Sequence, residues 1–220
     1  MRDFITLHIF RAATLLLLLY PSAGAQDSTG VTSGDIGVDR RQLLAVEQGR
    51  LAALSGCRDA ETFFRYLRVV PAESVCWRLL PFRHPLRRGA LRYTSPFGYR
   101  RHPVTRRRQL HKGLDIAAAP GSTVYAAGAG QVHRIGYDRY LGYFVRIQHG
   151  FGWTSLYGHL SRIETQAGRY LNAGTPIGYS GNTGRTTGPH LHFGVYYHGQ
   201  AVDGSRYLRL LQEAINKSYP

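Results

Sequence analysis

Between residues 122 and 197 the sequence repeats one pattern, in which short runs of alternating apolar and polar residues are separated by glycine-containing turns. Runs of this kind, rich in Val, Ile, Tyr and Thr, are typical of half-buried strands. No helical stretch lies between successive runs, so the strand-helix alternation of a parallel sheet is missing. The pattern therefore predicts a compact antiparallel β domain. Its expected strands are Ser122 to Ala127, Gly130 to Ile135, Tyr143 to Gln148, Trp153 to Leu156, Pro176 to Tyr179 and His192 to Tyr197.

Histidines and one aspartate stand out beside these runs. His190 and His192 are two residues apart in an extended stretch, so their side chains are expected on one face of a strand. Upstream, His111 and Asp115 are four residues apart, and His159 lies between the two motifs. A catalytic zinc site takes three nitrogen or oxygen ligands and leaves its fourth position to water. Two histidines and the aspartate satisfy that count, whereas a His-x-His pair alone would fit surface histidines equally well.

Four stretches between Tyr93 and Tyr207 carry a family resemblance. They are Ser95-Pro96-Phe97-Gly98-Tyr99-Arg100, His111-x-Gly113-x-Asp115, Tyr157-x-His159-Leu160-Ser161 and Gly188-Pro189-His190-Leu191-His192-Phe193. In their order and spacing they resemble the LytM or lysostaphin-type zinc endopeptidases, the M23 peptidase family, which cut the peptide part of bacterial peptidoglycan. The resemblance implies a mainly β protein, with that family's antiparallel β-sheet catalytic domain over residues 79–210.

Carried over residue by residue, the resemblance makes His111, Asp115 and His192 the Zn²⁺ ligands, and His159 and His190 the catalytic histidines. The stretch contains no His-Glu-x-x-His motif, so a glutamate base of that kind is not available. A neutral imidazole is a sufficient base for a zinc-bound water, whose pKa is about 7. We expect the two catalytic histidines to share proton abstraction and oxyanion stabilisation, in an order that the sequence does not assign.

The resemblance implies an exported zinc metalloendopeptidase that hydrolyses peptide cross-links of peptidoglycan. The alternative is a non-catalytic LytM-like regulator that binds and activates another cell-wall hydrolase. Regulators of that kind typically lack one or more zinc ligands, and all five positions are filled here, which favours the enzyme. The formal charge of +15 favours an anionic partner. Nucleic acid would fit that charge, but the export signal described below argues against it. The bacterial envelope offers other polyanions, which are the stem-peptide carboxylates of peptidoglycan, lipopolysaccharide and anionic lipid surfaces.

The N-terminal segment 1–25 is typical of a signal peptide. Arg2 and Arg11 flank its start, Ala12 to Tyr20 is apolar, and Ala23-Gly24-Ala25 fits a cleavage site. An uncleaved anchor is the alternative, but a membrane span needs about 20 apolar residues and Arg11 interrupts this one. We expect a periplasmic or secreted protein without a transmembrane span after cleavage. Residues 26–39 are polar and predict a flexible lead-in.

Residues 40–78 predict a small helical hairpin. Apolar residues recur at helical intervals from Arg40 to Leu54, and a second helix is expected between Asp59 and Pro71. Cys57 and Cys76 bracket the second helix, and in an exported chain they predict a disulfide; metal or redox thiols are the alternative. The sequence does not assign the role of the hairpin: it either packs beside the catalytic groove or holds a partner, such as an envelope or secretion-machinery protein. The remaining expectations are a monomer and a C-terminal tail over residues 211–220.

Three further features remain open at this level. Tyr157 would share a face with His159 in an extended segment, so it either orients substrate or is structural. His102 and His149 are expected in buried or turn-stabilising roles rather than as ligands. Arg106-Arg107-Arg108 precedes the first ligand and is either a solvated loop or a contact for substrate.

Overall fold

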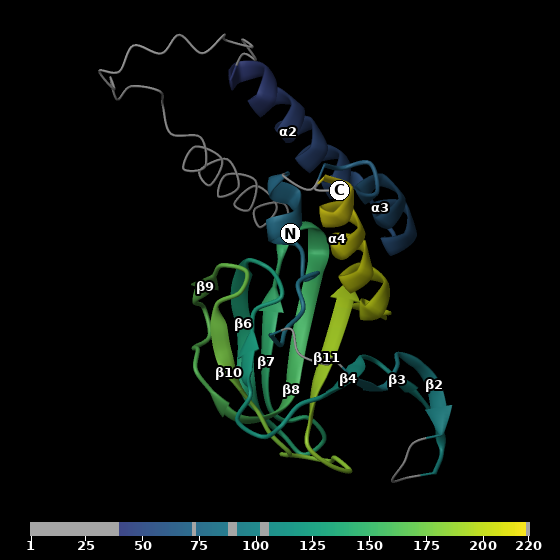
Figure 1. The fold of residues 1–220 in the computed structure, drawn as a ribbon, viewed down its shortest axis with the longest axis vertical. Helices are drawn as coiled ribbons and strands as arrows, with labels where there is room; N and C mark the ends of the chain where they lie inside the picture. Colours follow the sequence, from purple (N-terminus) through teal and green to yellow (C-terminus); the bar gives the residue numbers. More distant parts are fainter. Residues whose placement is uncertain (1–39, 72–73, 88–91, 102–105, 219–220) are drawn as a thin grey trace, which may run out of the picture. The chain divides into compact units, whose positions relative to one another are not determined.

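The computed structural model describes residues 40–71, 74–87, 92–101 and 106–218 (Figure 1). The expected signal peptide and lead-in lie outside these residues. The chain divides into two compact units, residues 1–57 and 58–220. Within the described ranges, none of the helices combines the length and the apolar character that crossing a membrane requires.

Helix α2 (Arg40–Gly56) belongs to the first unit and covers the first predicted helix. Leu51 and Leu54 are buried, one helical turn apart, as the apolar spacing predicts. Glu47 accepts a hydrogen bond of 2.8 Å from Arg50 on the next turn, which neutralises a largely buried carboxylate. The first unit therefore contributes one helix to the described structure.

Helix α3 (Ala60–Leu67) belongs to the second unit and begins directly after Asp59. The Asp59 carboxylate accepts the backbone N–H of Thr62 at 2.7 Å, and this bond lowers the pKa of Asp59 below its usual value. The helix buries Phe63 and Leu67 and ends before Pro71. A short 3₁₀ helix, η1 (Val75–Leu79), follows.

The predicted bridge between Cys57 and Cys76 joins a residue of the first unit to one of the second. Among the described residues the structure contains no disulfide. The bridge therefore stays a prediction that rests on the sequence and on the expected export.

The second unit is built on antiparallel strands. They are β1 (Tyr93–Ser95), β2 (Gly98–Arg101), β3 (Arg108–His111), β4 (Leu114–Ala117), β5 (Thr123–Tyr125), β6 (Gly130–Asp138), β7 (Gly142–Gln148), β8 (Trp153–Ile163), β9 (Tyr170–Leu171), β10 (Pro176–Ser180), β11 (His190–Tyr197) and β12 (Gln200–Val202). The main sheet has the order β1-β4-β11-β8-β7-β6-β9, with β10 paired to β8 and β5, and β12 paired to β11. Strands β2 and β3 form a separate hairpin beside β4 (Figure 1).

This topology confirms the mainly β, antiparallel fold. Each of the six predicted strands has a counterpart, and β8 extends well beyond the predicted end at Leu156. The extension carries Tyr157, Gly158 and His159, where glycine and histidine interrupt the apolar alternation, and pairing with β11 and β10 keeps this segment in the sheet. The shorter strands β1 to β4, β9 and β12 were not predicted, because two to four residues do not establish an alternation.

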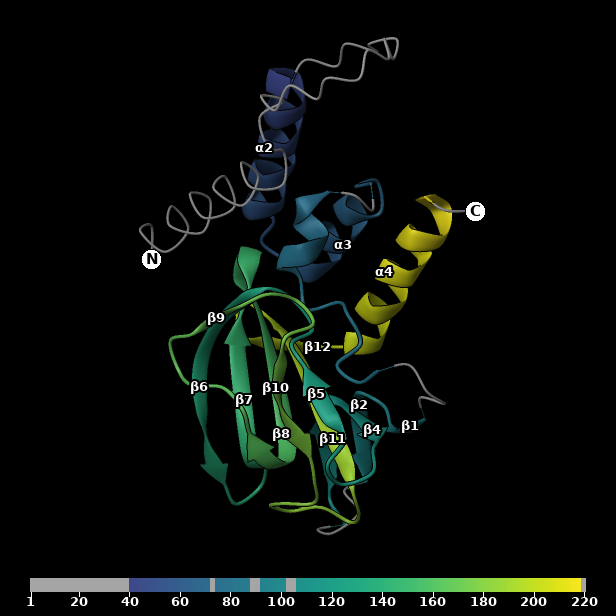
Figure 2. The same ribbon diagram turned by 60° about the vertical axis from the view of Figure 1, so that its left-hand side comes forward.

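The helices of the second unit lie at one end of the sheet (Figure 2), and an aromatic cluster joins them to it. The ring of Trp153 lies 5.3 Å from Phe63 of α3, 5.1 Å from Phe82 and 4.8 Å from Tyr207, between ring centroids. Such edge-to-face contacts add about 0.5–1.5 kcal/mol each beyond the burial of area. Tyr207 lies on α4 (Gly204–Ser218), so this cluster fixes both helices on the sheet.

Helix α4 was not predicted, and the expected boundary at residue 210 lies inside it. Its apolar residues nevertheless recur at helical intervals, a pattern that the sequence analysis did not use: Tyr207, Leu210, Leu211, Ala214 and Ile215. Tyr207 and Leu210 are buried, and Tyr207 stacks on Phe82 at 5.0 Å. Tertiary packing therefore supports a conformation that the local sequence already favours.

A chain of buried hydrogen bonds connects His149 to two residues of β8. His149 Nδ1 lies 2.9 Å from the Ala129 carbonyl, so it carries the proton and Nε2 accepts from the Ser155 hydroxyl at 2.7 Å. Ser155 and Tyr157 share a bond of 3.0 Å, and the Tyr157 oxygen accepts the backbone N–H of Ala127 at 2.8 Å. Every group in this chain is satisfied only while the His149 ring is neutral. Burial accordingly lowers the pKa of His149 to about 4.

We expect the neutral His149 ring to make the protein sensitive to acid. The histidine pKa is 6.5 when exposed and about 4 in the folded protein, so between these values the unfolded chain binds the additional proton. The free energy of unfolding should therefore fall by about 1.4 kcal/mol per pH unit as the pH drops, or about 3 kcal/mol over the window. Denaturant unfolding of the parent and His149→Gln from pH 7 to pH 4 measures this contribution.

The His149→Gln variant should be less stable at pH 7, because it loses the ordered hydrogen bonds, but its stability should fall less steeply with pH. His133→Gln is the matched control, since His133 is exposed on β6. If the free energy of unfolding changes with pH equally in the parent and in His149→Gln, then His149 has the same pKa in the folded and the unfolded state.

Candidate metal centre

Strand β11 forms the floor of the site, between β4 and β8 (Figure 1). In the register of these strands, His192 lies opposite Asp115 of β4 and opposite Gly158 of β8. Residues paired across neighbouring strands project to the same face, so His192 and Asp115 meet there. His111, at the end of β3, reaches the same face from the β2–β3 hairpin.

Three donor atoms converge in this position. His111 Nε2 lies 3.0 Å from Asp115 Oδ1 and 3.2 Å from His192 Nδ1, and His192 Nδ1 lies 2.9 Å from Asp115 Oδ1. In tetrahedral zinc sites with metal–ligand distances of about 2.0–2.1 Å, two ligands lie about 3.3 Å apart. The three atoms therefore form a triangle close to one face of such a tetrahedron. All three residues are buried, and they form a group suited to holding a metal ion.

Gly113, between the two ligands of the His111-x-Gly113-x-Asp115 motif, makes room for the third. A Cβ atom at Gly113 would lie 2.7 Å from His192 Cε1 and 2.8 Å from the Phe193 carbonyl oxygen. These distances are far shorter than a real Cβ contact, so any other residue would displace the His192 ring. The motif thus encodes the space for His192 as well as two of the donors.

The electrostatics of the triad suit a cation. Burial opposes the charge on Asp115, but the His111 and His192 rings beside its Oδ1 keep its pKa well below the usual value. Burial lowers the pKa of His192, against the opposite influence of Asp115. The carboxylate is thus ionised and the His192 imidazole neutral near neutral pH, which are the forms that bind metals.

The tautomer of His111 is fixed from its far side. Its Nδ1 donates to the carbonyl oxygen of Pro96 at 2.7 Å, so Nε2 is the unprotonated nitrogen that faces the triad. Histidines that bind metals usually make such a bond with their second nitrogen, because it orients the ring. The arrangement is therefore that of a metal ligand.

Two more imidazoles adjoin the triad. His159 and His190 are 4.6 Å apart between ring centroids, and His190 Nε2 lies 3.6 Å from Asp115 Oδ1. His159 Nδ1 donates to the Thr183 carbonyl at 2.8 Å, and His190 Nδ1 donates to the Gly188 carbonyl at 2.8 Å. Both neutral rings therefore carry the proton on Nδ1, which leaves Nε2 as their basic nitrogen. Each ring can accept a proton there and, once protonated, donate it.

The position of His159 depends on an unusual backbone. Its φ angle is +59°, in the left-handed region that non-glycine residues rarely occupy, and its N–H donates to the Leu141 carbonyl at 2.6 Å. Such conformations persist only where the surroundings hold them, and they concentrate at functional sites. Burial lowers the pKa of His159 to about 4, despite the bond to the Thr183 carbonyl.

The structure brings together all five residues that the sequence analysis selected. Both side chains of the His-x-His pair reach Asp115, which confirms that His190 and His192 share a face. His102 lies outside the described residues. The proposed roles of the five residues, as ligands and as proton carriers, stay proposals.

The suggestion that Tyr157 orients substrate is wrong. Its side chain is fully buried, and its hydroxyl bonds to Ser155 and to the backbone of Ala127 rather than facing the triad. The face-sharing argument assumed regular alternation along β8, and the left-handed backbone at His159 breaks that alternation. Burial also raises the pKa of Tyr157 to about 12, so it remains a neutral hydrogen-bonding group.

One contact of the triad was not predicted. Arg100 of β2 donates from Nη2 to Asp115 Oδ2 at 3.3 Å. Arg100 ends one of the four stretches that carry the family resemblance, Ser95-Pro96-Phe97-Gly98-Tyr99-Arg100. However, 15 residues separate it from Asp115, so the sequence alone does not indicate the contact. Only the β2–β3 hairpin brings the two together.

Two histidines and one aspartate are the donor set of a catalytic metal site, which leaves its fourth position to water, rather than that of a structural site, which has four protein ligands. Residues 109–204 match the model of peptidase family M23. Residues 109–204 of this chain therefore form a peptidase M23 domain.

Relatives and solved structures agree with this assignment. The peptidoglycan DD-endopeptidase ShyA of Vibrio cholerae is 43% identical over 116 residues, which are 52% of this chain and 27% of ShyA. The DD-carboxypeptidase/endopeptidase Mpg of Neisseria meningitidis is 43% identical over 112 residues, 51% of this chain and 26% of Mpg. The chain thus spans about a quarter of the length of these curated relatives.

Two solved structures share the fold of the domain. A zinc-containing peptidase from Vibrio cholerae superposes with a TM-score of 0.53 and 36% identity, over 58% of this chain and 39% of that one. The catalytic domain of lysostaphin from Staphylococcus simulans gives a TM-score of 0.50 and 27% identity, over 54% of this chain and 92% of that domain.

Proposed function

We propose that this protein is an exported zinc metalloendopeptidase that hydrolyses peptide cross-links of bacterial peptidoglycan. The observation that carries the proposal is the triangle of His111, Asp115 and His192 donor atoms, 2.9–3.2 Å apart, with two tautomer-fixed imidazoles beside it. A regulator that only binds another hydrolase would need neither the complete triad nor the two extra rings.

His111, Asp115 and His192 would hold the metal through Nε2, Oδ1 and Nδ1. Two neutral nitrogen donors and one carboxylate suit Zn²⁺, and a zinc-containing peptidase is among the structures that share this fold. When bound, zinc would polarise the scissile carbonyl and lower the pKa of a water in the open position to about 7.

His159 and His190 would carry the protons. The Nε2 atom of one ring accepts the proton of the attacking water, and the other ring, protonated, donates to the oxyanion that develops on the scissile carbonyl. The low pKa of His159 keeps that ring neutral and able to accept a proton. His190, whose Nε2 lies 3.6 Å from the Asp115 carboxylate, would then be the ring that donates to the oxyanion.

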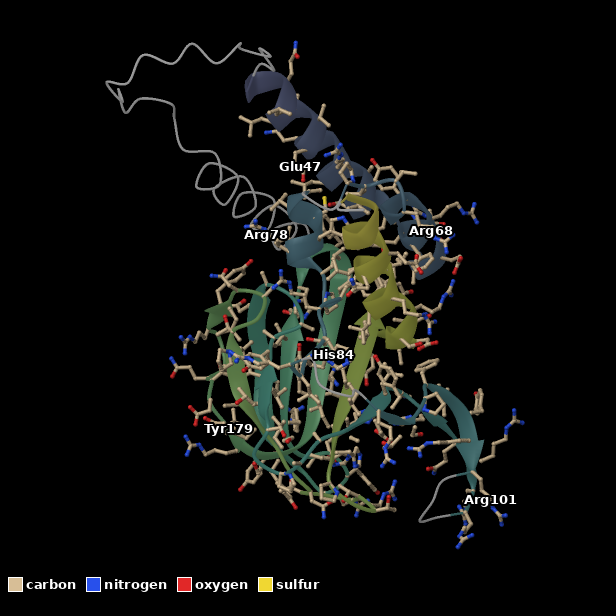
Figure 3. All side chains as sticks on the ribbon, viewed as in Figure 1. Glu47, Arg68, Arg78, His84, Arg101 and Tyr179 are labelled. Carbon is tan, nitrogen blue, oxygen red and sulfur yellow. The ribbon has the colours of Figure 1, made fainter. Side chains whose placement is uncertain are left out.

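Peptidoglycan suits the surface as well as the site. The relatives ShyA and Mpg carry peptidoglycan DD-endopeptidase and DD-carboxypeptidase/endopeptidase in their names. The chain has a formal charge of +15, and exposed arginines line the β2–β3 hairpin, with Arg101 at its outer end (Figure 3). Guanidinium groups bind the carboxylates that stem peptides present.

Export, the disulfide and the partner surface complete the proposal. The segment 1–25 supports export to the periplasm or the exterior, where Cys57 and Cys76 would be oxidised. Residues 40–78 would bind an envelope or secretion-machinery protein. The protein itself would act as a monomer.

Digestion of purified peptidoglycan sacculi tests the proposal. The mature protein should release soluble cross-linked fragments with new peptide termini, detected by mass spectrometry, and should contain one zinc per chain. A chelator should abolish release, and added Zn²⁺ should restore it, because the metal supplies the polarising charge. Metal-loaded, folded protein that binds sacculi without cutting them, yet stimulates a second hydrolase, would support the regulator instead.

A further inference from the structure

The two oxygens of Asp115 have different partners. Oδ1 faces the imidazoles, 3.0 Å from His111 Nε2 and 2.9 Å from His192 Nδ1. Oδ2 accepts from Arg100 Nη2 at 3.3 Å, on the side away from the triad. The carboxylate is thus held at both ends, and only one end is turned toward the metal position.

We propose that Arg100 is a positioning residue that holds Asp115 as a single-oxygen ligand. This inference rests on the proposed metal-binding role of the triad and adds a residue that the triad does not contain. By occupying Oδ2, Arg100 prevents the carboxylate from rotating so that both oxygens approach one metal ion. The fourth side of the site then stays open for a water and the scissile carbonyl.

The fold makes this contact specific to Arg100. In the β2–β3 hairpin Gly98 pairs with His111 and Arg100 pairs with Gln109, so Arg100 and the ligand His111 lie on one face of the hairpin. Arg101 lies on the other face, exposed, and donates from Nε to the Arg106 carbonyl at 3.1 Å. One hairpin therefore delivers a ligand together with the group that orients the next ligand.

The effect of the Arg100–Asp115 contact on metal affinity depends on how far the two side chains are buried. The side chain of Arg100 is 31% exposed and that of Asp115 only 10%. Surface ion pairs contribute little, but groups that orient a buried metal ligand typically affect metal affinity ten- to a hundredfold. Orientation and charge act in opposite directions here. Removing a positive charge near a cation site should strengthen metal binding, whereas releasing the carboxylate should weaken it.

Metal titration separates these two effects. Metal-depleted parent, Arg100→Ala, Arg100→Lys and the matched control Arg101→Ala are titrated with Zn²⁺ against a chromophoric chelator. Arg100→Ala should bind Zn²⁺ about ten- to a hundredfold more weakly than the parent. Arg100→Lys should recover part of the affinity, because one ammonium donor can still reach Oδ2, and Arg101→Ala should match the parent.

The visible spectrum of the Co²⁺-loaded proteins reports coordination directly. Four-coordinate Co²⁺ absorbs more strongly than five-coordinate Co²⁺, so Arg100→Ala should absorb less than the parent if Oδ2 joins the metal. Thermal unfolding of the metal-free proteins checks folding; if Arg100→Ala unfolds early, the comparison is made with Arg100→Lys and Arg100→Gln. Parent-like affinity and spectrum in the folded Arg100 variants, or tighter binding, would overturn the inference. A parent that binds no metal would instead contradict the proposed function.

Discussion

The His192→Ala variant is expected to bind zinc more than a hundredfold more weakly than the parent protein. His192 supplies one of three donor atoms, and losing a ligand should exceed the ten- to hundredfold cost of losing a group that only orients one. The His111 and Asp115 donors would remain 3.0 Å apart, but two donors do not define a tetrahedral site. Metal analysis after dialysis and chelator competition measure the loss.

Two variants make this result specific. Asp115→Asn keeps the side-chain volume while removing the charged oxygen, so it should lose zinc too if the triad is the site. His159→Ala removes a neighbouring imidazole, whose ring centroid is 5.9 Å from that of His192, and should retain zinc. Near-stoichiometric zinc in folded His192→Ala would exclude His192 as a ligand, and zinc loss in His159→Ala as well would point to a different donor set.

Much of this site could be predicted because most of its residues lie in short sequence motifs on strands. The period of two in an extended segment is sufficient to place His190 and His192 on one face, as the structure confirms. The position of Asp115 opposite His192 depends on the register of β4 and β11, which only the family resemblance made accessible. Donor types and local spacing were therefore readable, whereas the distances among the donors required the fold.

The parts that were missed depend on long-range contacts or on irregular backbone. Arg100 reaches Asp115 only through the β2–β3 hairpin, whose strands are too short to show an alternation. Tyr157 was misplaced because the sequence does not reveal the left-handed backbone at His159. In both cases tertiary structure overrides a local pattern. Helix α4 differs, because its apolar residues from Tyr207 to Ile215 recur at helical intervals that the sequence analysis did not use.

The left-handed backbone at His159, which the sequence does not reveal, also places the His159 ring where it could act in catalysis. Regular alternation would turn the His159 ring to the same side as the buried Tyr157 hydroxyl. The φ angle of +59° instead allows the ring to bond with the Thr183 carbonyl beside His190. The surroundings that hold this conformation include Gly142, where a Cβ would lie 2.1 Å from Thr183 Oγ1. The start of β7 can therefore pack against Thr183 only because residue 142 is glycine.

Replacing either His159 or His190 with alanine is expected to reduce the rate of peptidoglycan hydrolysis by about 10² to 10⁴, the usual contribution of a positioned acid or base. Both rings carry their proton on Nδ1, held by the carbonyls of Thr183 and Gly188, so each has only Nε2 for proton transfer. Since neither residue supplies a donor to the triad, zinc should remain bound in both variants. The kcat on a soluble cross-linked peptide fragment, measured beside zinc content, separates catalysis from metal loss.

The double variant and a surface control decide how the two rings act. If one accepts the proton of the water while the other donates to the oxyanion in the same step, removing both should cost less than the product of the single losses. His133→Ala, which removes an exposed imidazole from β6, should hydrolyse the fragment at the parent rate. Parent-like kcat in both single variants with zinc retained would mean that neither ring moves the proton.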